Sequence, residues 1–318
     1  MGVRSPRDPR RPSSSRRGGR VSGFAIVTVT HDSERDVDRL LASVRRELAE
    51  QPQVVVVDSG SSDRSTEIAS EWGAEVLELP HNAGFGAGCN AGIALVTAPV
   101  TALVNPDIEL LGPGLAELAR RAAEEEALLA PRLLNADGTT QDSAHPPPGR
   151  IDDLIPAVLP RPLLPPPLRR RYEPWRSERS RRVGWVTAAC VVARTNVLRR
   201  LGPFDEGAFL FYEDMELCLA AARAGVPSVL HPDVALRHLG GTSTSQALAT
   251  DEDLLLRARR RREVVAREGR VRLALDDAAQ AATFTTRAAA RRLARRGGDR
   301  ERAQLRALRV ARRGGVRR

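Results

Sequence analysis

The sequence contains no lysine, so every one of its 50 basic residues is an arginine. Its three cysteines, Cys89, Cys190 and Cys218, lie far apart and form no C-x-x-C pair. This sparse count argues against a disulfide framework or a cysteine-based zinc site, and it fits buried thiols in a reducing compartment. Aromatic residues make up only 3% of the chain. Because single-stranded nucleic acid is bound on aromatic stacking platforms, their scarcity argues against that class of protein.

Long hydrophobic runs are also missing. No stretch approaches the roughly 20 apolar residues that cross a bilayer, and the leucine- and proline-rich run at 155–168 is broken by six prolines and an arginine. Arg16 and Arg17 are not followed by the apolar part of a secretory signal, because the run at 24–30 ends after seven residues. We therefore expect a cytoplasmic protein that meets a membrane only peripherally, at the inner face of the plasma membrane.

The formal net charge of +10 is unevenly distributed. Residues 1–20 carry seven arginines and one aspartate, and residues 251–318 carry 21 arginines and nine acidic residues, which leaves −8 for residues 21–250. We predict a disordered basic segment at 1–20, a globular domain at 21–250 and a tail of basic amphipathic helices at 251–318. The tail suits two roles, contact with anionic lipid headgroups or a solvated helical appendage.

Apolar runs alternate with helical patterns in the globular domain. Continuous apolar runs predict buried strands at 24–30, 54–57, 74–79 and 100–107. Apolar residues at helical spacing over 37–48 and 114–126 predict helices that follow strands. This alternation is typical of an α/β fold in which helices flank a mostly parallel sheet. Residues 145–182, rich in proline and arginine, predict a long irregular excursion, after which the pattern resumes at 183–194, 213–226 and 227–241.

Polar side chains follow three of the predicted strands, at Thr30-His31-Asp32, Asp58-Ser59-Gly60-Ser61 and Asn105-Pro106-Asp107. Ligands of an open parallel sheet bind beyond the carboxyl ends of its strands. Asp58 fits two roles equally well, hydrogen bonding to a nucleotide base or ribose and capping the next helix. Asp107 is a candidate metal ligand, although Asn105 stands where a second carboxylate is expected.

A glycine-rich segment, Gly86-x-Gly88-x-x-Ala91, nearly matches the dinucleotide-binding fingerprint. That fingerprint follows the first strand of its fold, whereas this segment follows the third, so a hydride-transferring enzyme is a poor alternative. The glycines instead allow the backbone to approach a phosphate, or a helix to pack closely on the sheet.

Two further groups could carry chemistry. Glu213 and Asp214 begin a predicted helix after the aromatic-rich loop "GPFDEGAFLFYED". Acidic residues at a helix start are commonly only favourable charges, but a carboxylate sheltered by such a loop is also a candidate general base. His238 is a lone histidine before two glycines; such a histidine is more often a surface or core residue than a metal ligand.

Seven segments occur in the order that is typical of the family 2 glycosyltransferases, which are inverting enzymes with the GT-A fold. The segments are "VTVTHDS", "VVVDSGSSD", "NAGFGAGCNAG", "LVNPDIEL", "GWVTAACVVAR", "GPFDEGAFLFYEDMELCLAAARAG" and "RHLGGTS", and together they span roughly residues 23–245. The chain thus resembles this family. Its "N-x-G-F-G" and "N-P-D" forms most resemble those of rhamnosyltransferases.

The resemblance implies a nucleotide-sugar site. Its residues are Thr30, Asp58, Asn82, Gly84 and Asn105. The implied donor is a nucleoside diphosphate sugar, with L-rhamnose from dTDP-rhamnose as the expected case. The implied acceptor is a hydroxyl of a lipid-linked glycan on a polyprenyl diphosphate or of a cell-wall precursor.

The resemblance also implies roles in metal binding and catalysis. Asp107 takes the last position of the D-x-D motif, whose carboxylate holds the Mg²⁺ or Mn²⁺ that bridges the donor diphosphate, and His238 matches a histidine that closes the metal site in several relatives. Asp214 becomes the general base with Glu213 as its supporting neighbour, and Trp185 lies on the acceptor side.

Two alternatives remain beside a metal-dependent glycosyltransferase. The first is a catalytically silent relative that only binds a nucleotide or glycan. The second is an arginine-rich nucleic-acid binder, which would leave the seven segments unexplained. We therefore expect no nucleic-acid partner.

Overall fold

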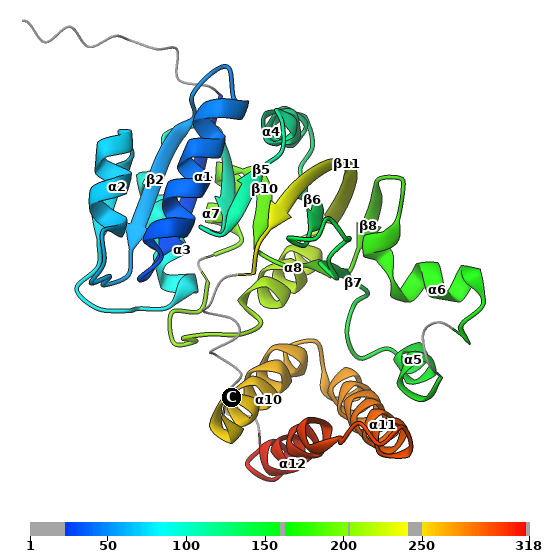
Figure 1. Ribbon diagram of the computed structural model, residues 1–318. Coiled ribbons are helices and arrows are strands. Elements are labelled where there is room, and N and C mark those ends of the chain that lie inside the picture. The colour runs from blue at the N-terminus through cyan, green and yellow to red at the C-terminus, as the bar shows by residue number, and fades with distance from the viewer. Residues whose placement is uncertain (1–22, 160–162, 203, 241–249, 316–318) are drawn as a thin grey trace, which may run out of the picture.

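The computed structural model describes residues 23–159, 163–202, 204–240 and 250–315. The predicted N-terminal segment 1–20 lies outside the described residues. A nine-stranded sheet crosses the upper part of the molecule in the view of Figure 1, in the order β3-β2-β1-β4-β10-β6-β11-β5, with β8 paired to β11. Its strands are β1 (Phe24–Thr30), β2 (Gln53–Asp58), β3 (Glu75–Glu78), β4 (Val100–Val104), β5 (Ile108–Leu110), β6 (Leu128–Leu134), β8 (Arg181–Val183), β10 (Cys190–Arg194) and β11 (Ser228–His238).

The N-terminal half of this sheet is parallel. β1 pairs with β2 and β4, and β2 pairs with β3, all in parallel. The register sets Thr30 beside Asp58, so the polar residues that end these strands reach the same edge of the sheet. Strand β10 then runs antiparallel to β4, and β5 antiparallel to β11. A separate two-stranded sheet joins β7 (Ala144–His145) to β9 (Trp185–Val186).

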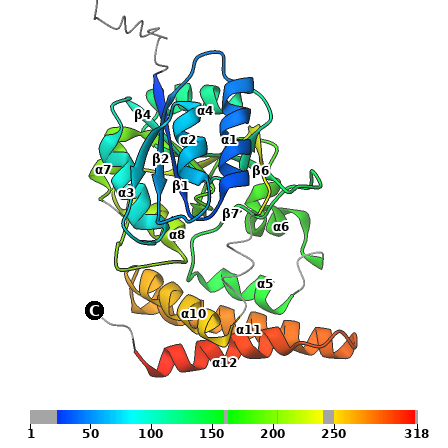
Figure 2. The ribbon, with the colours of Figure 1, turned by 60° about the vertical axis from the view of Figure 1, so that its left-hand side comes forward.

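Helices cover both faces of the sheet, as the continuous apolar strands predicted (Figure 2). One face packs against α1 (Glu34–Glu47), α2 (Ser65–Trp72) and α4 (Gly114–Glu124). The other packs against α3 (Phe85–Leu95), α7 (Thr195–Arg200) and α8 (Glu213–Arg223). The two hydrophobic cores alternate along each strand; Ile26 belongs to the first and Val27 to the second, because successive strand residues point to opposite faces.

The glycines of α3 bring this helix against β1. A Cβ atom at Gly92 would lie 2.4 Å from Val27 Cγ1, and one at Gly88 would lie 2.6 Å from Val29 Cγ1. Both distances are shorter than any tolerable carbon–carbon contact. Of the two explanations for the glycine-rich segment, close helix packing therefore accounts for Gly88 and Gly92.

The excursion at 145–182 is more ordered than its composition predicted. It contains η1 (Ile151–Asp153), α5 (Leu154–Val158), α6 (Pro166–Tyr172) and η3 (Pro174–Arg176). Three of its prolines, Pro166, Pro167 and Pro174, stand at the first turns of α6 and η3, where a missing N–H costs nothing. The prediction of an irregular segment is thus wrong for these four short helices.

The tail forms three helices below the sheet, α10 (Asp251–Ala266), α11 (Arg270–Leu293) and α12 (Asp299–Arg313) (Figure 1). Thr250 and Asp253 form a capping box at the start of α10. The predicted C-terminal helical region is confirmed. Among the described residues, no helix is long and apolar enough to cross a membrane.

The arginines on one side of α10 point into the protein. Met215 and Leu219 of α8 form an apolar cluster with Val264 and Val265 of α10. Beside this cluster the guanidinium of Arg260, only 5% exposed, pairs with the carboxylates of Glu216 and Asp205. Arg267 pairs with the same two carboxylates. Part of the positive charge of the tail therefore fixes α10 to the helix that carries Glu213 and Asp214.

Candidate functional site

A cavity of about 440 Å³ lies beyond the carboxyl ends of β1 and β4. Most of the residues predicted for the site line it, together with several that were not predicted. Its polar and aromatic lining residues include Thr30, His31, Asp36, Ser59, Asn82, Asn105, Asp107, Thr187, Phe209, Glu213 and Asp214. The position agrees with the rule for open parallel sheets, because the loops after the strands enclose it.

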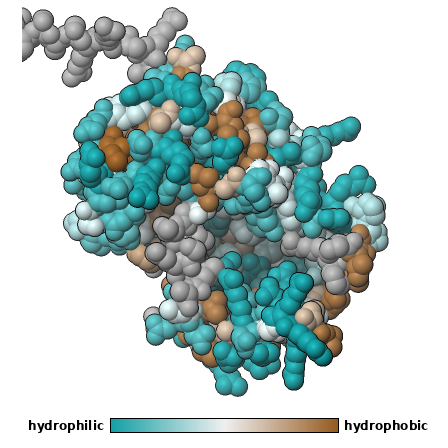
Figure 3. Space-filling view, in the orientation of Figure 1, coloured by the Kyte–Doolittle hydropathy of each residue, from teal (hydrophilic) through white to brown (hydrophobic). Residues whose placement is uncertain are grey.

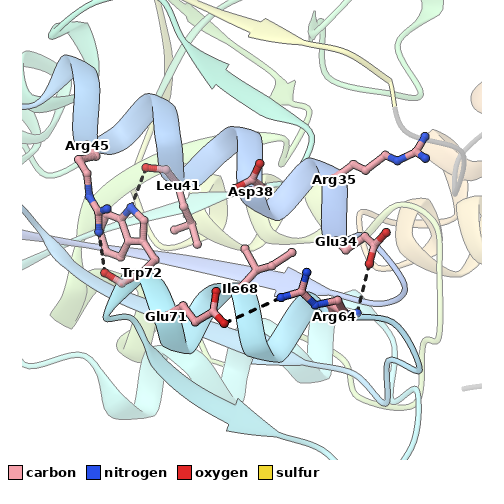
Figure 4. Close-up of a pocket in the computed structure, with 9 residues that line it drawn as sticks. All are labelled: Glu34, Arg35, Asp38, Leu41, Arg45, Arg64, Ile68, Glu71 and Trp72. Atoms are coloured by element: carbon pink, nitrogen blue, oxygen red, sulfur yellow. Dashed lines mark hydrogen bonds and ion pairs between the residues drawn. The ribbon is translucent and has the colours of Figure 1, made fainter.

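A second cavity, of about 590 Å³, lies between α1 and α2 (Figure 4). Several of its polar groups contact other residues of the protein. Arg45 donates a hydrogen bond to the carbonyl of Trp72 at 2.8 Å, and Arg64 lies 3.9 Å from Glu71 and donates its backbone N–H to Glu34. None of the predicted site residues lies there. We therefore place the functional site in the smaller cavity.

Two buried oxygen atoms in the smaller cavity have no hydrogen-bond partner among the described residues. They are Thr30 Oγ1 and Asn105 Oδ1. The backbone of Asn105 is held firmly, because its N–H donates to Ala189 and its carbonyl accepts from Ile108. Buried polar atoms are nearly always paired in folded proteins. Two unpaired oxygens that line one cavity indicate a ligand with hydrogen-bond donors.

The loop of Asn82 and Gly84 closes one side of the cavity. Asn82 Oδ1 accepts hydrogen bonds from Gly84 N at 3.1 Å and Ser59 Oγ at 3.3 Å. Gly84 has φ +85°, and a Cβ there would lie 2.4 Å from the carbonyl oxygen of Phe209. Glycine is thus required where this loop meets the loop before α8. Asn82 shapes the loop as well as lining the cavity.

The register of β5 on β11 brings Asp107 and His238 together. Ile108 lies opposite His238, and Asp107 precedes it in the turn after β4. His238 Nε2 is 3.2 Å from Asp107 Oδ1, and both side chains are almost fully buried. On the other side of the ring, His238 Nδ1 lies 2.7 Å from Gln141 Oε1. Because an amide oxygen only accepts, Nδ1 donates and Nε2 faces the carboxylate.

This pair fits a hard divalent cation. No group of three His, Cys, Asp or Glu side chains gathers as a metal site in the part of the chain that the structure describes. Mg²⁺, however, takes one or two protein ligands and completes its shell with water and substrate phosphates. Two ligands about 2.1 Å from an octahedral ion and at right angles lie about 3 Å apart, close to the 3.2 Å between His238 and Asp107. The Gln141 contact orients the imidazole as partners of metal-bound histidines do.

The first turn of α1 adds a second carboxylate to this side of the cavity. Burial raises the pKa of Asp36 above its usual value, and the charge of Asp107 raises it further. Asp36 also lies 3.3 Å from Arg39. A bound cation would relieve the repulsion between the two carboxylates.

Glu213 and Asp214 line the cavity from the first turn of α8. Burial raises the pKa of Asp214 from 3.8 to about 6, although the backbone N–H groups of Met215 and Ala188 lower it by bonding to the carboxylate. Burial also raises the pKa of Glu213, from 4.5 to about 7, and the charge of Asp214 adds to this effect. Both pKa values lie in the range where a carboxylate accepts and releases protons near neutrality.

The backbone before this acidic pair is strained. Phe211 and Tyr212 have φ values of +80° and +63°, a conformation that costs a bulky residue of order 1–3 kcal/mol. Helix α10 holds the strained residues in place: Arg257 donates to Tyr212 Oη at 3.1 Å, and Arg261 lies over the Tyr212 ring at 5.4 Å. The tail therefore supports the strained residue that directly precedes the acidic pair.

Three predicted site residues do not line the cavity. His238 adjoins it through Asp107; Asp58 and Trp185 have other contacts. Asp58 is 3% exposed, and its carboxylate accepts hydrogen bonds from the N–H and the hydroxyl of Ser61. In this structure it holds the turn after β2, and Asp63, not Asp58, accepts the N–H of Ser65 at the start of α2. Trp185 stacks on His145, with ring centroids 3.9 Å apart, and packs beside the Met215 cluster.

Sequence reasoning missed Asp36, Gln141 and Phe209. Asp36 follows the first strand closely, and its position at the carboxyl end of a parallel strand was a usable indication. Phe209 lies in the aromatic-rich loop and is 51% exposed on the cavity, which is unusual for so large an apolar side chain. Gln141 had no such indication, because it lies beside the end of β6 and the pairing of β11 with β6 brings His238 near it.

Family comparison agrees with this geometry. Residues 25–197, more than half of the chain, match the family described as "Glycosyl transferase family 2". The chain belongs to this family. Residues 169–266 also match "Glycosyltransferase like family 2". The protein is thus a glycosyltransferase, and the family that its sequence segments resemble is confirmed.

Two relatives illustrate the range of this glycosyltransferase family. The N-acetylglucosaminyl-diphospho-decaprenol L-rhamnosyltransferase of Mycobacterium tuberculosis is 29% identical over 239 residues, which cover 70% of this chain and 77% of that protein. The low-salt glycan biosynthesis hexosyltransferase Agl10 of Haloferax volcanii is 23% identical over 214 residues, covering 65% of this chain and 64% of that protein. The glycosyltransferase is rhamnosyltransferase-like in its sequence.

Solved structures confirm the GT-A fold. The mannosyltransferase PcManGT from Pyrobaculum calidifontis, in complex with GDP-Man and Mn²⁺, superposes with a TM-score of 0.54 at 15% identity and covers 92% of this chain and 79% of its own. TarS of S. aureus superposes with a TM-score of 0.51 at 16% identity and covers 83% of this chain and 43% of its own. Enzymes with this fold typically use a divalent cation.

Proposed function

We propose that this glycosyltransferase inverts the configuration of a sugar as it moves it from a nucleoside diphosphate to an acceptor hydroxyl. The observation that carries the proposal is the 440 Å³ cavity, which a buried Asp107–His238 pair and the acidic pair of α8 both line or adjoin. A cation-binding pair suits the diphosphate of a donor. A carboxylate with a raised pKa suits the removal of a proton from an acceptor.

Asp214 is the proposed general base. Its carboxylate takes the proton of the acceptor hydroxyl while that oxygen attacks the anomeric carbon and the bond to the nucleoside diphosphate breaks. A single displacement of this kind inverts the anomeric configuration. The Met215 and Ala188 N–H groups hold the carboxylate in place, and burial raises its pKa enough to make it a useful base near neutral pH. Glu213 keeps its own proton longer and supports Asp214 as a neutral neighbour.

Asp107 and His238 are the proposed ligands of Mg²⁺ or Mn²⁺, with Gln141 fixing the imidazole. When bound, the cation neutralises charge that develops on the leaving diphosphate. Thr30 and Asn105 then accept hydrogen bonds from the sugar or ribose hydroxyls, and Asn82 and Gly84 shape the wall of the donor site. Asp58 contributes indirectly through the turn after β2.

We propose L-rhamnose from dTDP-rhamnose as the transferred sugar and a lipid-linked glycan as the acceptor. The support is the similarity to the mycobacterial rhamnosyltransferase, whose name states a diphosphate-linked lipid substrate. We also propose that residues 21–250 form the catalytic domain, between a basic segment at 1–20 and a helical tail at 251–318.

The tail is proposed to touch an anionic membrane at its cytoplasmic face. Val271 and Leu293 of α11 are 74% and 86% exposed, and exposed arginines such as Arg295 and Arg296 follow α11. Exposed apolar and basic side chains together suit a lipid surface. Nucleic acid is not a proposed partner, because Arg260, Arg261 and Arg262 of the densest arginine run pair with carboxylates of the protein.

A thermal-shift screen of dTDP-, UDP- and GDP-sugars, each with and without Mn²⁺, would identify the donor. We expect the largest stabilisation with dTDP-rhamnose and Mn²⁺, because ligands that bind only the folded state raise its stability. Transfer is then measured with the best donor and a lipid-linked acceptor.

Asp214→Asn tests the base. It should abolish transfer and leave the Mn²⁺-dependent shift with the donor intact, because it removes the proton acceptor and keeps the shape. Asp38→Asn, at an exposed carboxylate outside the cavity, is the matched control and should transfer normally. Full turnover by Asp214→Asn would exclude the proposed base, and donor binding without transfer in the unmodified enzyme would favour a catalytically silent protein.

A further inference from the structure

A third cavity, of about 270 Å³, is built largely by the excursion at 145–182 and by β8. Four arginines line it, Arg150, Arg171, Arg181 and Arg182, with Asp152 and Asp153 as the acidic lining residues. Neither the donor site nor the acidic pair of α8 uses this cavity. Four guanidinium groups around one hollow are the usual protein surroundings of a phosphate group, because each offers a planar fork of donors.

The ion pairs within the cavity leave positive charge available. Asp152 accepts contacts from both Arg150, at 3.2 Å, and Arg171. Asp153 accepts the backbone N–H of Arg150 at 2.9 Å, so the four guanidinium groups outnumber the two carboxylates of the lining. Arg181 donates to the carbonyl of Arg170 at 2.8 Å, which leaves its charge uncompensated. The Arg182 guanidinium has no hydrogen bond or ion pair with another described residue. The lining thus has a net positive charge.

The third cavity and the catalytic cavity lie along the same short strand. Gly184 lines the former and Thr187 the latter, with β9 between them. Three residues of extended chain span about 10 Å, comparable to a sugar ring with its anomeric phosphate. The wall between them is aromatic, because Trp185 of β9 stacks on His145 at 3.9 Å. An acceptor sugar at the catalytic cavity could therefore place a phosphate substituent among the arginines.

Apolar side chains continue outward from this cavity. Ile151 and Leu163, in the same excursion, are 73% and 68% exposed, and Val158 at the end of α5 is 62% exposed. The space-filling view shows apolar residues at this edge of the molecule, over α5 and α6 (Figure 3). The order from the catalytic cavity outward is therefore an aromatic wall, an arginine-lined hollow and an exposed apolar margin.

We propose that the cavity lined by Arg150, Arg171, Arg181 and Arg182 binds the diphosphate of a lipid-linked sugar acceptor. The lipid chain then leaves along Ile151, Val158 and Leu163 toward the membrane. This inference rests on the proposed transfer to an acceptor hydroxyl, and it assigns acceptor recognition to the excursion at 145–182. Trp185 and His145 then lie beside the bond that joins the sugar to its diphosphate.

The test compares two acceptors in the full-length enzyme. One is N-acetylglucosamine linked to farnesyl diphosphate, and the other is the octyl glycoside of the same sugar, which lacks the diphosphate. The double variant Arg181→Gln/Arg182→Gln removes two guanidinium groups from the cavity. The matched control, Arg170→Gln/Arg179→Gln, removes two exposed arginines that do not line it.

We expect the cavity variant to raise KM for the diphosphate acceptor by about tenfold or more, since charge-assisted hydrogen bonds are lost. Its kcat, its KM for the donor and its KM for the octyl glycoside should stay within about twofold of the unmodified enzyme, as should every constant of the control. Equal changes with both acceptors, or no change with either, would overturn the proposal.

Binding without transfer separates this proposal from the proposed reaction. The binding of farnesyl diphosphate is measured by calorimetry in the presence of EDTA. Because EDTA removes any cation from the donor site, binding of the diphosphate there is suppressed. The unmodified enzyme and the control should bind the ligand, and the cavity variant should bind it at least tenfold more weakly. This result would stand even if no acceptor were glycosylated. Equal binding of farnesyl diphosphate by the cavity variant and the unmodified enzyme would refute a diphosphate site. So would displacement of farnesyl diphosphate by phosphatidylglycerol vesicles but not by inorganic pyrophosphate.

Discussion

Transfer is expected to depend on pH through Asp214. Burial raises the pKa of Asp214 to about 6, and a general base must be deprotonated to accept a proton. Above this pKa, up to about pH 7 where Glu213 still keeps its proton, kcat/KM should rise to a plateau. Below this pKa, kcat/KM should fall by about tenfold for each pH unit, so that roughly a tenth of the plateau remains at pH 5.

The assay is the initial rate of nucleoside diphosphate release, measured with Mn²⁺ from pH 5 to 8.5 at constant ionic strength. The diphosphate of a sugar nucleotide stays ionised throughout this range, so the profile of kcat/KM reports groups on the enzyme and the acceptor. An aspartate with its ordinary pKa of 3.8 would remain a base down to pH 5. A flat profile between pH 5 and 8 would therefore refute the assignment of a buried Asp214 as the base.

The variant Glu213→Gln separates the two members of the acidic pair. Glu213 keeps its proton to about pH 7, so it is neutral while Asp214 titrates. Glu213→Gln should consequently leave the midpoint of the acid limb near that of the unmodified enzyme and retain measurable transfer. Loss of transfer in Glu213→Gln, with transfer retained by Asp214→Asn, would make Glu213 the base.

Stability gives an independent measure of the same burial. Folding raises the pKa of Glu213 above its unfolded value of 4.5. Between pH 4.5 and 7 the folded protein therefore keeps a proton on Glu213 that the unfolded chain releases. The free energy of unfolding consequently decreases as the pH rises from 4.5 through 7. Glu213→Gln should therefore be more stable than the unmodified enzyme at pH 8, by up to about 3 kcal/mol, and the difference should shrink as the pH falls toward 4.5. Urea unfolding at several pH values measures this difference.

Three other predictions concern the metal pair and the tail. Asp107→Ala should lose the Mn²⁺-dependent part of the donor thermal shift, whereas Asn105→Ala should weaken donor binding and keep its dependence on Mn²⁺; identical behaviour of the two variants would contradict the assignment. Gln141→Ala should weaken Mn²⁺ binding by about 10- to 100-fold by freeing the His238 ring, and unchanged affinity in a Mn²⁺ titration would exclude this role. Arg260→Met leaves Glu216 and Asp205 with only Arg267, so unfolding in urea should show a loss of about 3 kcal/mol; a loss below about 1 kcal/mol would mean that Arg260 does not fix α10 to α8.

The regular elements were predictable because their apolar residues repeat with the period of the structure. Strand β1 is a continuous apolar run, and α1 buries Val37, Leu40, Leu41 and Val44 at helical spacing. The helices α5 and α6 were not predicted, because each is too short to show a period and contains proline. Proline at the start of a helix and proline in an irregular loop cannot be distinguished by composition alone.

The site divides in the same way. Asp107 and Asp214 stand in segments whose residue order already indicated chemistry, and both line the cavity. The contact of His238 with Asp107 depends on the register of β5 on β11, which no local pattern specifies. Asp58 shows the opposite case, since its position after β2 suggested a ligand contact while Ser61 occupies its carboxylate.

The net charge of the tail follows from the sequence, but the contacts of each arginine depend on which face of its helix the arginine occupies. Arg257, Arg260 and Arg261 contact Tyr212 and Glu216 on the side of α10 that meets α8. Arg261 also pairs with Asp276 of α11. Because Tyr212 directly precedes the acidic pair in a strained conformation, these arginines act on the position of the proposed base. A net charge cannot reveal this, since an inward arginine and an outward one count equally. Arginines of one helical region thus fall into two groups: the inward ones contact residues on and directly before α8, and the outward ones are the ones that we propose contact a membrane.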